Sequence, residues 1–250
     1  MLENQKKIWI TGASSGIGKA VAEKFAQEGW KVAISARRKE ILDKISDNQN
    51  IFSFPLDVTD EKNCKSTFEE INQKLNGLDI CFFCSGTYDP KKEKEINIEQ
   101  NKFVMNVNYF GTLNCIKTVE KYFKNKKNGH ISIVSSIAGY RGLPNSSGYG
   151  PSKAALTNLA ESIYFDFKKF NVRVSLVSPG FIKTPLTDKN DFDMPFLRSP
   201  EFAAEKIYKG LVDSKSFEIH FPKQLTLTLK FLRILPYKIY LFLVDKLVKR

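Results

Sequence analysis

The fold is decided near the start of the chain, by the stretch Lys7-Ile-Trp-Ile-Thr-Gly-Ala-Ser-Ser-Gly-Ile-Gly18. Its first half is an apolar, β-rich run that ends at Thr11, and its second half is rich in glycine. From Gly16 onward, apolar residues recur at helical spacing. A strand, a glycine-rich turn and a helix in this order are typical of the first unit of a dinucleotide-binding sheet.

The rest of the chain continues to alternate between strand-like and helix-like segments. We expect strands over 7–11, 31–35, 51–56, 79–84, 130–135 and 172–178, and the clearest helices over 16–28, 39–45 and 154–167. This alternation predicts βαβ units, and therefore a Rossmann-like, doubly wound parallel sheet in a three-layer α/β/α arrangement. The 250 residues show no internal repeat or low-complexity linker, so a single domain is expected over residues 1–220.

The cysteines and histidines do not predict a metal site. Cys81 and Cys84 share an apolar strand-like run, where their odd separation places the two thiols on opposite faces. His130 and His220 lack carboxylates or thiols at ligand spacing. With no secretory signal and no apolar run long enough to span a bilayer, these thiols favour the cytoplasm.

The glycine-rich turn predicts a nucleotide site. Glycine allows the backbone to approach a pyrophosphate closely, and the N-terminus of the next helix offers N–H groups and the positive end of its dipole. We expect the cofactor to contact Gly12, Ser14, Ser15, Gly16, Ile17 and Gly18. After the third strand, Asp57 and Val58 are placed to border the adenine.

The end of the second predicted strand favours NADP(H) over NAD(H). A site that selects NAD normally has Asp or Glu here, which binds the ribose 2′-OH. This chain has Ala36 followed by Arg37 and Arg38, and the guanidinium group suits a phosphate dianion. Arg37 is the expected main ligand of the 2′-phosphate, whereas Arg38 is either a second ligand or a solvated charge.

A second group of residues indicates acid–base chemistry. Tyr149 and Lys153 are four residues apart, so they share one face of a helix that has begun by Tyr149. A lysine cation nearby favours the phenolate and lowers the pKa of a tyrosine. Such a tyrosine acts as an acid toward a carbonyl or as a base toward an alcohol. Ser136 precedes Tyr149 by thirteen residues, at the end of a predicted strand.

Together these motifs resemble those of the short-chain dehydrogenase/reductase family. The resemblance covers about residues 7–184 and rests on Thr11–Gly18, Asn108-Tyr-Phe-Gly111, Ser136, Tyr149 with Lys153, and Pro179-Gly180 with Thr184. It implies an NAD(P)-dependent oxidoreductase that reduces a carbonyl or oxidises a secondary alcohol. One departure is Phe83-Cys-Ser-Gly86, where the family usually has Asn-Asn-Ala-Gly. Gly86 keeps the clearance beside the cofactor, but the lost amides put in doubt a network that braces the sheet.

The resemblance also implies a role for each matching residue. Tyr149 is the expected general acid/base, Lys153 lowers its pKa and holds the nicotinamide ribose, and Ser136 hydrogen-bonds the substrate oxygen. Asn108, preferred to Asn106 on its spacing to Gly111, is expected to anchor a water that links Lys153 to solvent. The remaining cofactor contacts are Pro179 and Gly180 beside the nicotinamide, and Thr184 at its carboxamide or at the pyrophosphate.

Two segments break the alternation of strands and helices, namely residues 186–200 and the tail from Phe221 onward. A third, short segment is charged. Lys91–Glu95 is expected to be a solvated loop. Residues 186–200, called the lid below, are rich in Asp and Pro, and they follow a strand end where doubly wound sheets bind ligands. We expect the lid to cover the substrate with Phe192, Met194, Phe196 and Leu197; an ordinary surface loop is the alternative. An apolar lid favours an apolar or lipid-like substrate.

Residues 221–250, called the tail, carry much of the net charge of +12. Seven cations stand there against the single acid Asp245: Lys223, Lys230, Arg233, Lys238, Lys246, Lys249 and Arg250. Leucines are interleaved with them, and Pro236 divides the tail into two helical pieces. The pattern suits either an anionic membrane surface at the inner face of a membrane or a partner subunit of a homo-oligomer. Nucleic acid is disfavoured because few polar side chains could read bases.

A different class of function also fits the cofactor motifs, namely an NADP(H)-binding sensor or scaffold without catalytic activity. A missing catalytic group would favour this alternative. Ser136, Tyr149 and Lys153 are all present, so an oxidoreductase is the main prediction.

Overall fold

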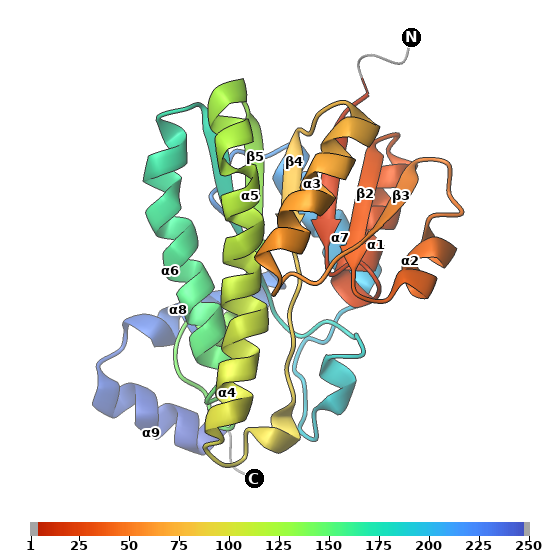
Figure 1. Cartoon of the computed structure of the whole chain (residues 1–250). Helices are drawn as coiled ribbons and strands as arrows, with labels where there is room; N and C mark the ends of the chain where they lie inside the picture. The colour runs from red at the N-terminus through yellow and green to blue at the C-terminus, as the bar shows by residue number, and fades with distance from the viewer. Residues whose placement is uncertain (1–4, 248–250) are drawn as a thin grey trace.

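A seven-stranded parallel sheet lies at the centre of the structure, a computed structural model that describes residues 5–247 (Figure 1). The strand order is β3-β2-β1-β4-β5-β6-β7. The strands are β1 (Lys7–Thr11), β2 (Lys31–Ala36), β3 (Ile51–Pro55), β4 (Ile80–Phe83), β5 (Gly129–Val134), β6 (Val172–Pro179) and β7 (Glu218–Phe221). The order reverses between β1 and β4, where doubly wound sheets bind their ligands. The predicted Rossmann-like sheet is confirmed.

Helices cover both faces of this sheet and make the three layers (Figure 1). One face carries α1 (Gly16–Gln27), α2 (Lys39–Ile45) and α7 (Pro200–Val212). The other carries α3 (Glu61–Leu75), α5 (Gly111–Lys126) and α6 (Tyr149–Lys168). The short α4 (Ile98–Met105) continues into α5 through a π-helical turn, Asn106–Phe110.

The strands divide their side chains between two apolar cores. In β1, Ile8 and Ile10 point into the core beneath α1 and α7, whereas Trp9 points into the core beneath α3, α5 and α6. Cys81 lies in this second core and Cys84 packs against the first. The two thiols therefore point to opposite faces of the sheet, as the alternation of strand side chains predicts. Both are free thiols.

The tail forms two further helices, α8 (Lys223–Ile234) and α9 (Tyr237–Leu247), with Pro236 between them as predicted. The inner face of α8 packs on the body of the protein through Leu225, which contacts Ile137 and Tyr140. In α9, Tyr240 and Val244 pack against Leu232 of α8. The tail cations Lys249 and Arg250 lie outside the described residues.

Arg141 holds the corner between α8 and α9. Its Nη1 donates hydrogen bonds to the carbonyl oxygens of Leu232 (3.1 Å), Arg233 (3.2 Å) and Leu235 (2.7 Å), so it satisfies the C-terminal carbonyls of α8. The guanidinium carbon also lies 4.5 Å from the ring centre of Tyr237 and 3.9 Å from that of Tyr240. A single side chain on the loop after Ser136 thus fixes the first turn of α9.

We predict that Arg141→Ala loosens the tail while the sheet stays folded. The substitution removes three hydrogen bonds and two cation–π contacts, so the free energy of local opening of α9 should fall by about 2 kcal/mol. Amide hydrogen exchange would measure this as faster exchange across α9 with little change in β1. Arg198→Ala is the control, because the Arg198 side chain stacks on Phe202 of α7, at 5.4 Å from the ring centre, and its backbone bonds survive the substitution. Unchanged exchange in α9 would show that Arg141 does not hold the corner.

Candidate active site

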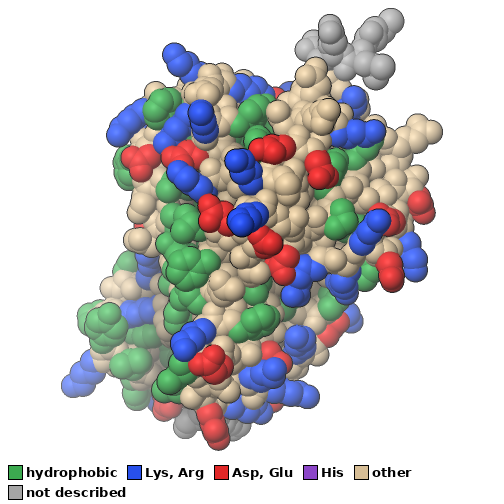
Figure 2. All heavy atoms as spheres, viewed as in Figure 1, with side chains coloured by type: hydrophobic (Ala, Val, Ile, Leu, Met, Phe, Trp, Pro, Cys, Tyr) green, Lys and Arg blue, Asp and Glu red, His purple; other side chains and the backbone are tan. Residues whose placement is uncertain are grey.

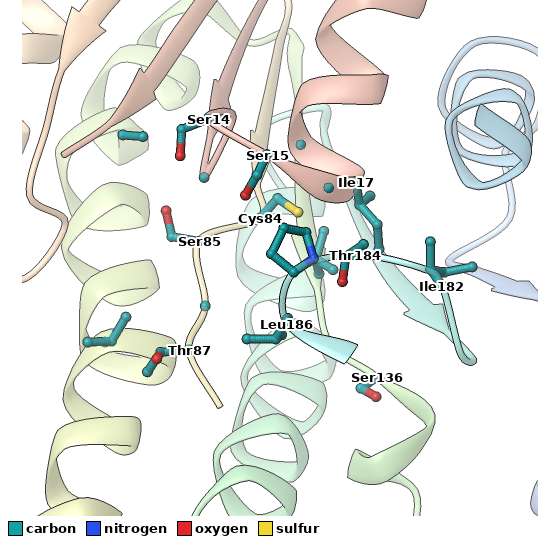
Figure 3. Close-up of a pocket in the computed structure, with 18 of the residues that line it drawn as sticks. Ser14, Ser15, Ile17, Cys84, Ser85, Thr87, Ser136, Ile182, Thr184 and Leu186 are labelled. Atoms are coloured by element: carbon teal, nitrogen blue, oxygen red, sulfur yellow. The ribbon is translucent and has the colours of Figure 1, made fainter. Parts of the chain in front are cut away.

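A pocket opens at the carboxyl ends of the strands, at the reversal between β1 and β4 (Figure 3). Figure 3 shows Ser14 and Ser15 from the turn after β1, Ser85 and Thr87 from the segment after β4, and Thr184 and Leu186 from the segment after β6. The lining includes these predicted residues: Gly12, Ser14, Ser15, Gly16, Ile17, Gly18, Arg37, Arg38, Asp57, Val58, Gly86, Ser136, Tyr149, Lys153, Pro179, Gly180 and Thr184. The fold thus brings both predicted groups of residues into one site.

The turn after β1 is shaped for close approach to a ligand. Gly12 has a φ of +70°, and a Cβ there would lie 2.8 Å from the carbonyl oxygen of Cys84. A Cβ on Gly18 would overlap the carbonyl oxygen of Gly12. Ser15 makes no side-chain hydrogen bond to the N-terminus of α1, and the first turn of α1 contains no acidic residue. Its N–H groups therefore face the pocket without a competing anion, which suits a pyrophosphate.

Beyond this turn, the pocket is basic at the end of β2. Ala36, Arg37 and Arg38 all line it, and Nη2 of Arg38 donates a 2.8 Å hydrogen bond to Oγ of Ser14. Two guanidinium groups therefore lie beside the glycine turn. Asp57 also lines the pocket, but its Oδ1 already accepts hydrogen bonds from the Thr59 N–H and hydroxyl, at 3.0 Å and 2.8 Å.

Helix α6 begins at Tyr149, and Lys153 follows one turn later. The two side chains therefore lie on the same face of the helix, as expected. Lys153 Nζ lies 5.6 Å from the Tyr149 ring centre and donates a 3.0 Å hydrogen bond to the carbonyl of Val134. Burial lowers the pKa of Lys153 to about 8. Burial also raises the pKa of Tyr149 to about 12, against the opposing effect of a hydrogen bond with Ser136. The phenol is thus held protonated beside an ammonium group that loses its proton more readily than usual.

Asn108 is fully buried behind the pocket rather than in its lining. Its Oδ1 accepts the Thr87 N–H at 2.7 Å, and its Nδ2 donates to the Thr87 carbonyl at 3.1 Å and to Oγ of Ser152 at 2.9 Å. The π-helical turn carries this side chain, and Gly86 lies against both Asn108 and Lys153. Asn108 therefore ties the segment after β4 to α6, whereas Asn106 is exposed.

The departure at Cys84 and Ser85 does not leave the sheet unbraced. Oγ1 of Thr11, at the end of β1, accepts hydrogen bonds from the N–H groups of Cys84 (3.2 Å) and Ser85 (3.3 Å). One hydroxyl therefore links the ends of β1 and β4 below the pocket. Burial raises the pKa of the Cys84 thiol to about 11, so this side chain acts as a small apolar group.

Glu93 is a site residue that the sequence does not reveal. The sequence predicts a solvated loop over Lys91–Glu95, and this is wrong for Glu93, which is only 2% exposed. Its carboxylate accepts hydrogen bonds from the Gly148 N–H at 3.0 Å and from the Tyr149 N–H at 3.1 Å. An anion at this position caps α6 where it begins. The partners lie more than fifty residues away in a loop without periodic pattern, so no local signal marks the interaction.

The lid is only partly in the pocket. Leu186, Thr187 and Lys189 belong to the lining. The expected substrate contacts Phe192, Met194 and Phe196 do not, and both phenylalanines are 49% exposed. Lys94 pairs with Asp191 at 2.8 Å and Phe192 packs on Phe181 with ring centres 5.9 Å apart. The structure therefore ties the middle of the lid to neighbouring loops and leaves its apolar side chains outside the pocket lining.

Comparisons with known proteins identify the family. The short chain dehydrogenase family matches residues 6–194. An uncharacterized oxidoreductase of Myxococcus xanthus is 32% identical over 232 residues, 91% of each chain. The 3-oxoacyl-(acyl-carrier-protein) reductase FabG of Thermotoga maritima is 35% identical over 185 residues, 72% of this chain and 75% of that protein. The solved structure of ElxO with NADP bound is 28% identical, with a TM-score of 0.75, over 86% of this chain and 97% of that chain.

This chain belongs to the short-chain dehydrogenase family, and it is an NAD(P)-dependent oxidoreductase that acts on carbonyl or alcohol groups. Solved structures of this fold hold NAD in one case and NADP in another, so the choice between them depends on the residues of each chain. Within residues 5–247, no helix has the length and apolar character needed to cross a membrane. The same residues contain no cluster of three or more His, Cys, Asp or Glu side chains that could hold a metal ion.

We predict that Glu93→Ala destabilises the protein through the N-terminus of α6. Two buried N–H groups lose a charged acceptor, so the free energy of unfolding should fall by about 2 kcal/mol, measured by urea denaturation. Glu95→Ala is the matched control, because Glu95 is exposed in the same loop. Equal stability of the two variants would mean that the Glu93 hydrogen bonds contribute nothing net.

Proposed function

We propose that this enzyme is an NADPH-dependent reductase of an apolar carbonyl compound, with Tyr149 as its general acid. The observation that carries the proposal is the single pocket in which Ser136, Tyr149 and Lys153 meet the uncapped glycine turn and two arginines. In the reverse direction, the same phenol would act as a base toward a secondary alcohol.

The preference for NADP(H) over NAD(H) rests on the end of β2. No carboxylate stands there to bind a ribose 2′-OH, and Arg37 and Arg38 both reach the lining. We assign Arg37 as the main ligand of the 2′-phosphate. Arg38, bonded to Ser14, is the second. The NADP bound to ElxO, a relative of the same fold, supports this choice.

Bound NADPH supplies the hydride, and the protein provides orientation and a proton. Tyr149 donates its phenolic proton to the substrate oxygen as negative charge develops there, and Ser136 stabilises the same oxygen with a hydrogen bond. Because burial is the largest cause that raises the pKa of Tyr149 to about 12, the reaction needs the Lys153 cation to make the phenolate accessible. Asn108 holds the segment around Gly86 against Lys153, and we propose that a water beside it links Lys153 to solvent as the proton relay.

We propose that the substrate is apolar and lipid-like. Ile182, Pro185 and Leu186 line the pocket beyond Ser136, and closure of the lid would add Phe192, Met194 and Phe196. In this arrangement residues 1–220 form the oxidoreductase domain, with its lid over about 186–200, and residues 221–250 form an attachment segment. A homo-oligomer is proposed, because Phe110 at the end of the π-helical turn and Phe165 on α6 expose 49% and 66% of their surface. A cytoplasmic location is proposed because the four cysteines are free thiols.

We predict that NADPH binds at least tenfold more tightly than NADH, measured by fluorescence titration of the purified protein. Arg37→Ala should weaken NADPH binding about tenfold or more and leave NADH binding unchanged, since only NADPH carries the 2′-phosphate. Lys39→Ala, which removes an exposed cation two residues further on, is the control. Equal binding of both nucleotides would refute the assignment at Arg37 and leave the proposed role of Tyr149 standing.

We predict that Tyr149→Phe lowers turnover about a thousandfold, since it removes the proton donor and little else. NADPH affinity should stay within a few-fold of wild type, because the ring still packs against Tyr88, with ring centres 4.7 Å apart. Turnover is followed as NADPH oxidation with medium-chain aldehydes and ketones. Wild-type protein that binds NADPH and reduces none of a broad carbonyl panel would support the sensor or scaffold instead.

A further inference from the structure

The outer faces of α8 and α9 expose seven large apolar side chains. Their exposed fractions are Leu227 56%, Phe231 61%, Ile234 77%, Tyr237 76%, Ile239 48%, Leu241 60% and Phe242 57%. The inner faces of the two helices are already buried. Their apolar side chains pack against the body of the protein or against each other, namely Leu225, Leu232, Tyr240 and Val244. The exposed set is therefore a second apolar face, and a patch of this kind normally marks a binding surface.

Basic side chains surround this face. Between residues 223 and 246 the chain has Lys223, Lys230, Arg233, Lys238 and Lys246 against the single acid Asp245. Of these cations, Lys230 pairs with Glu218, whereas Arg233 and Lys238 are exposed. Figure 2 shows hydrophobic and basic side chains side by side over α8 and α9, at its lower left.

We propose that the α8–α9 face docks on the surface of an anionic lipid bilayer. The apolar side chains would enter the boundary between headgroups and acyl chains, and the cations would meet the lipid phosphates. Charge favours this occupant over a second copy of the same face. A two-fold interface would bring the cations of one copy against those of the other, whereas anionic lipids neutralise them.

The inner face of α8, opposite the docking face, packs against residues next to the active site. Leu225 of α8 packs on Ile137, the residue after Ser136, and a Cβ on Gly180 would lie 3.0 Å from Leu225 Cδ2. Phe181 belongs to the same cluster and contacts Phe192 of the lid. Apolar side chains therefore connect α8 to the lid beside the pocket. Docking would place this side of the site at the bilayer, where an apolar carbonyl compound is concentrated; this second step rests on the proposed function.

The test is co-sedimentation of the full-length protein with vesicles. We expect binding to phosphatidylcholine vesicles that contain about one-third phosphatidylglycerol, with weaker binding at high salt and little to phosphatidylcholine alone. Phe231→Ser/Phe242→Ser should reduce binding about tenfold or more, and Phe231→Leu/Phe242→Leu, which keeps the face apolar, should not. Arg233→Glu/Lys238→Glu should also reduce binding, in contrast to Lys62→Glu/Lys65→Glu on the exposed face of α3.

NADPH binding and reduction of a water-soluble aldehyde are measured on every variant. These readouts test the proposed function and the integrity of the fold separately from lipid binding. Wild-type protein that shows no preference for anionic vesicles would overturn the docking proposal. Light scattering gives a second test. If the wild-type protein is a dimer, and Phe231→Ser/Phe242→Ser makes it a monomer without changing vesicle binding, the proposal is also overturned, because the face is then a subunit interface.

Discussion

The close approach between the turn after β1 and the end of β4 is the constraint on which the site depends. Gly12 lies so near the Cys84 carbonyl that no side chain fits there, and Gly18 lies even closer to the Gly12 carbonyl. The Thr11 hydroxyl joins the same two strand ends by accepting the N–H groups of Cys84 and Ser85. This contact sets where α1 begins. The uncapped N-terminus of α1 consequently points across the crevice at which the strand order reverses.

The second fixed point is the start of α6, and it depends on groups remote in sequence. Pro151 is compatible with a first helical turn, where its missing N–H costs nothing. The Glu93 carboxylate binds the N–H groups of Gly148 and Tyr149, so the helix begins at Tyr149 itself. Asn108 then ties Ser152 to the segment after β4. The Tyr149 ring is thus oriented by its own helix turn, by a loop anion and by a buried amide, all close to the nucleotide turn.

Local signals in the sequence predict most of this architecture. The strand and helix periods place β1 and α2 at their observed bounds, and the glycine turn, Ser136, Tyr149 and Lys153 converge as expected. The failures share a physical cause, because they involve side chains whose environment is set by distant partners. The charge of Glu93 suggests a solvated side chain, yet the carboxylate is buried and accepts hydrogen bonds from two backbone N–H groups. Apolarity suggests that Phe192 faces the substrate, yet Phe181 holds it outside the lining.

The tail and the active site form one structural unit, because one loop contacts both. The short loop after β5 carries Ser136 at its start, Ile137 in contact with Leu225, and Arg141 at the corner of α8 and α9. The residue that we assign to the substrate oxygen is therefore followed within five positions by the residue that anchors the tail. A force applied to α9, by lipid or by a partner, would be transmitted through Arg141 and Leu225 to this loop. Packed side chains of this kind transmit small displacements, since interiors are close-packed and hardly compressible.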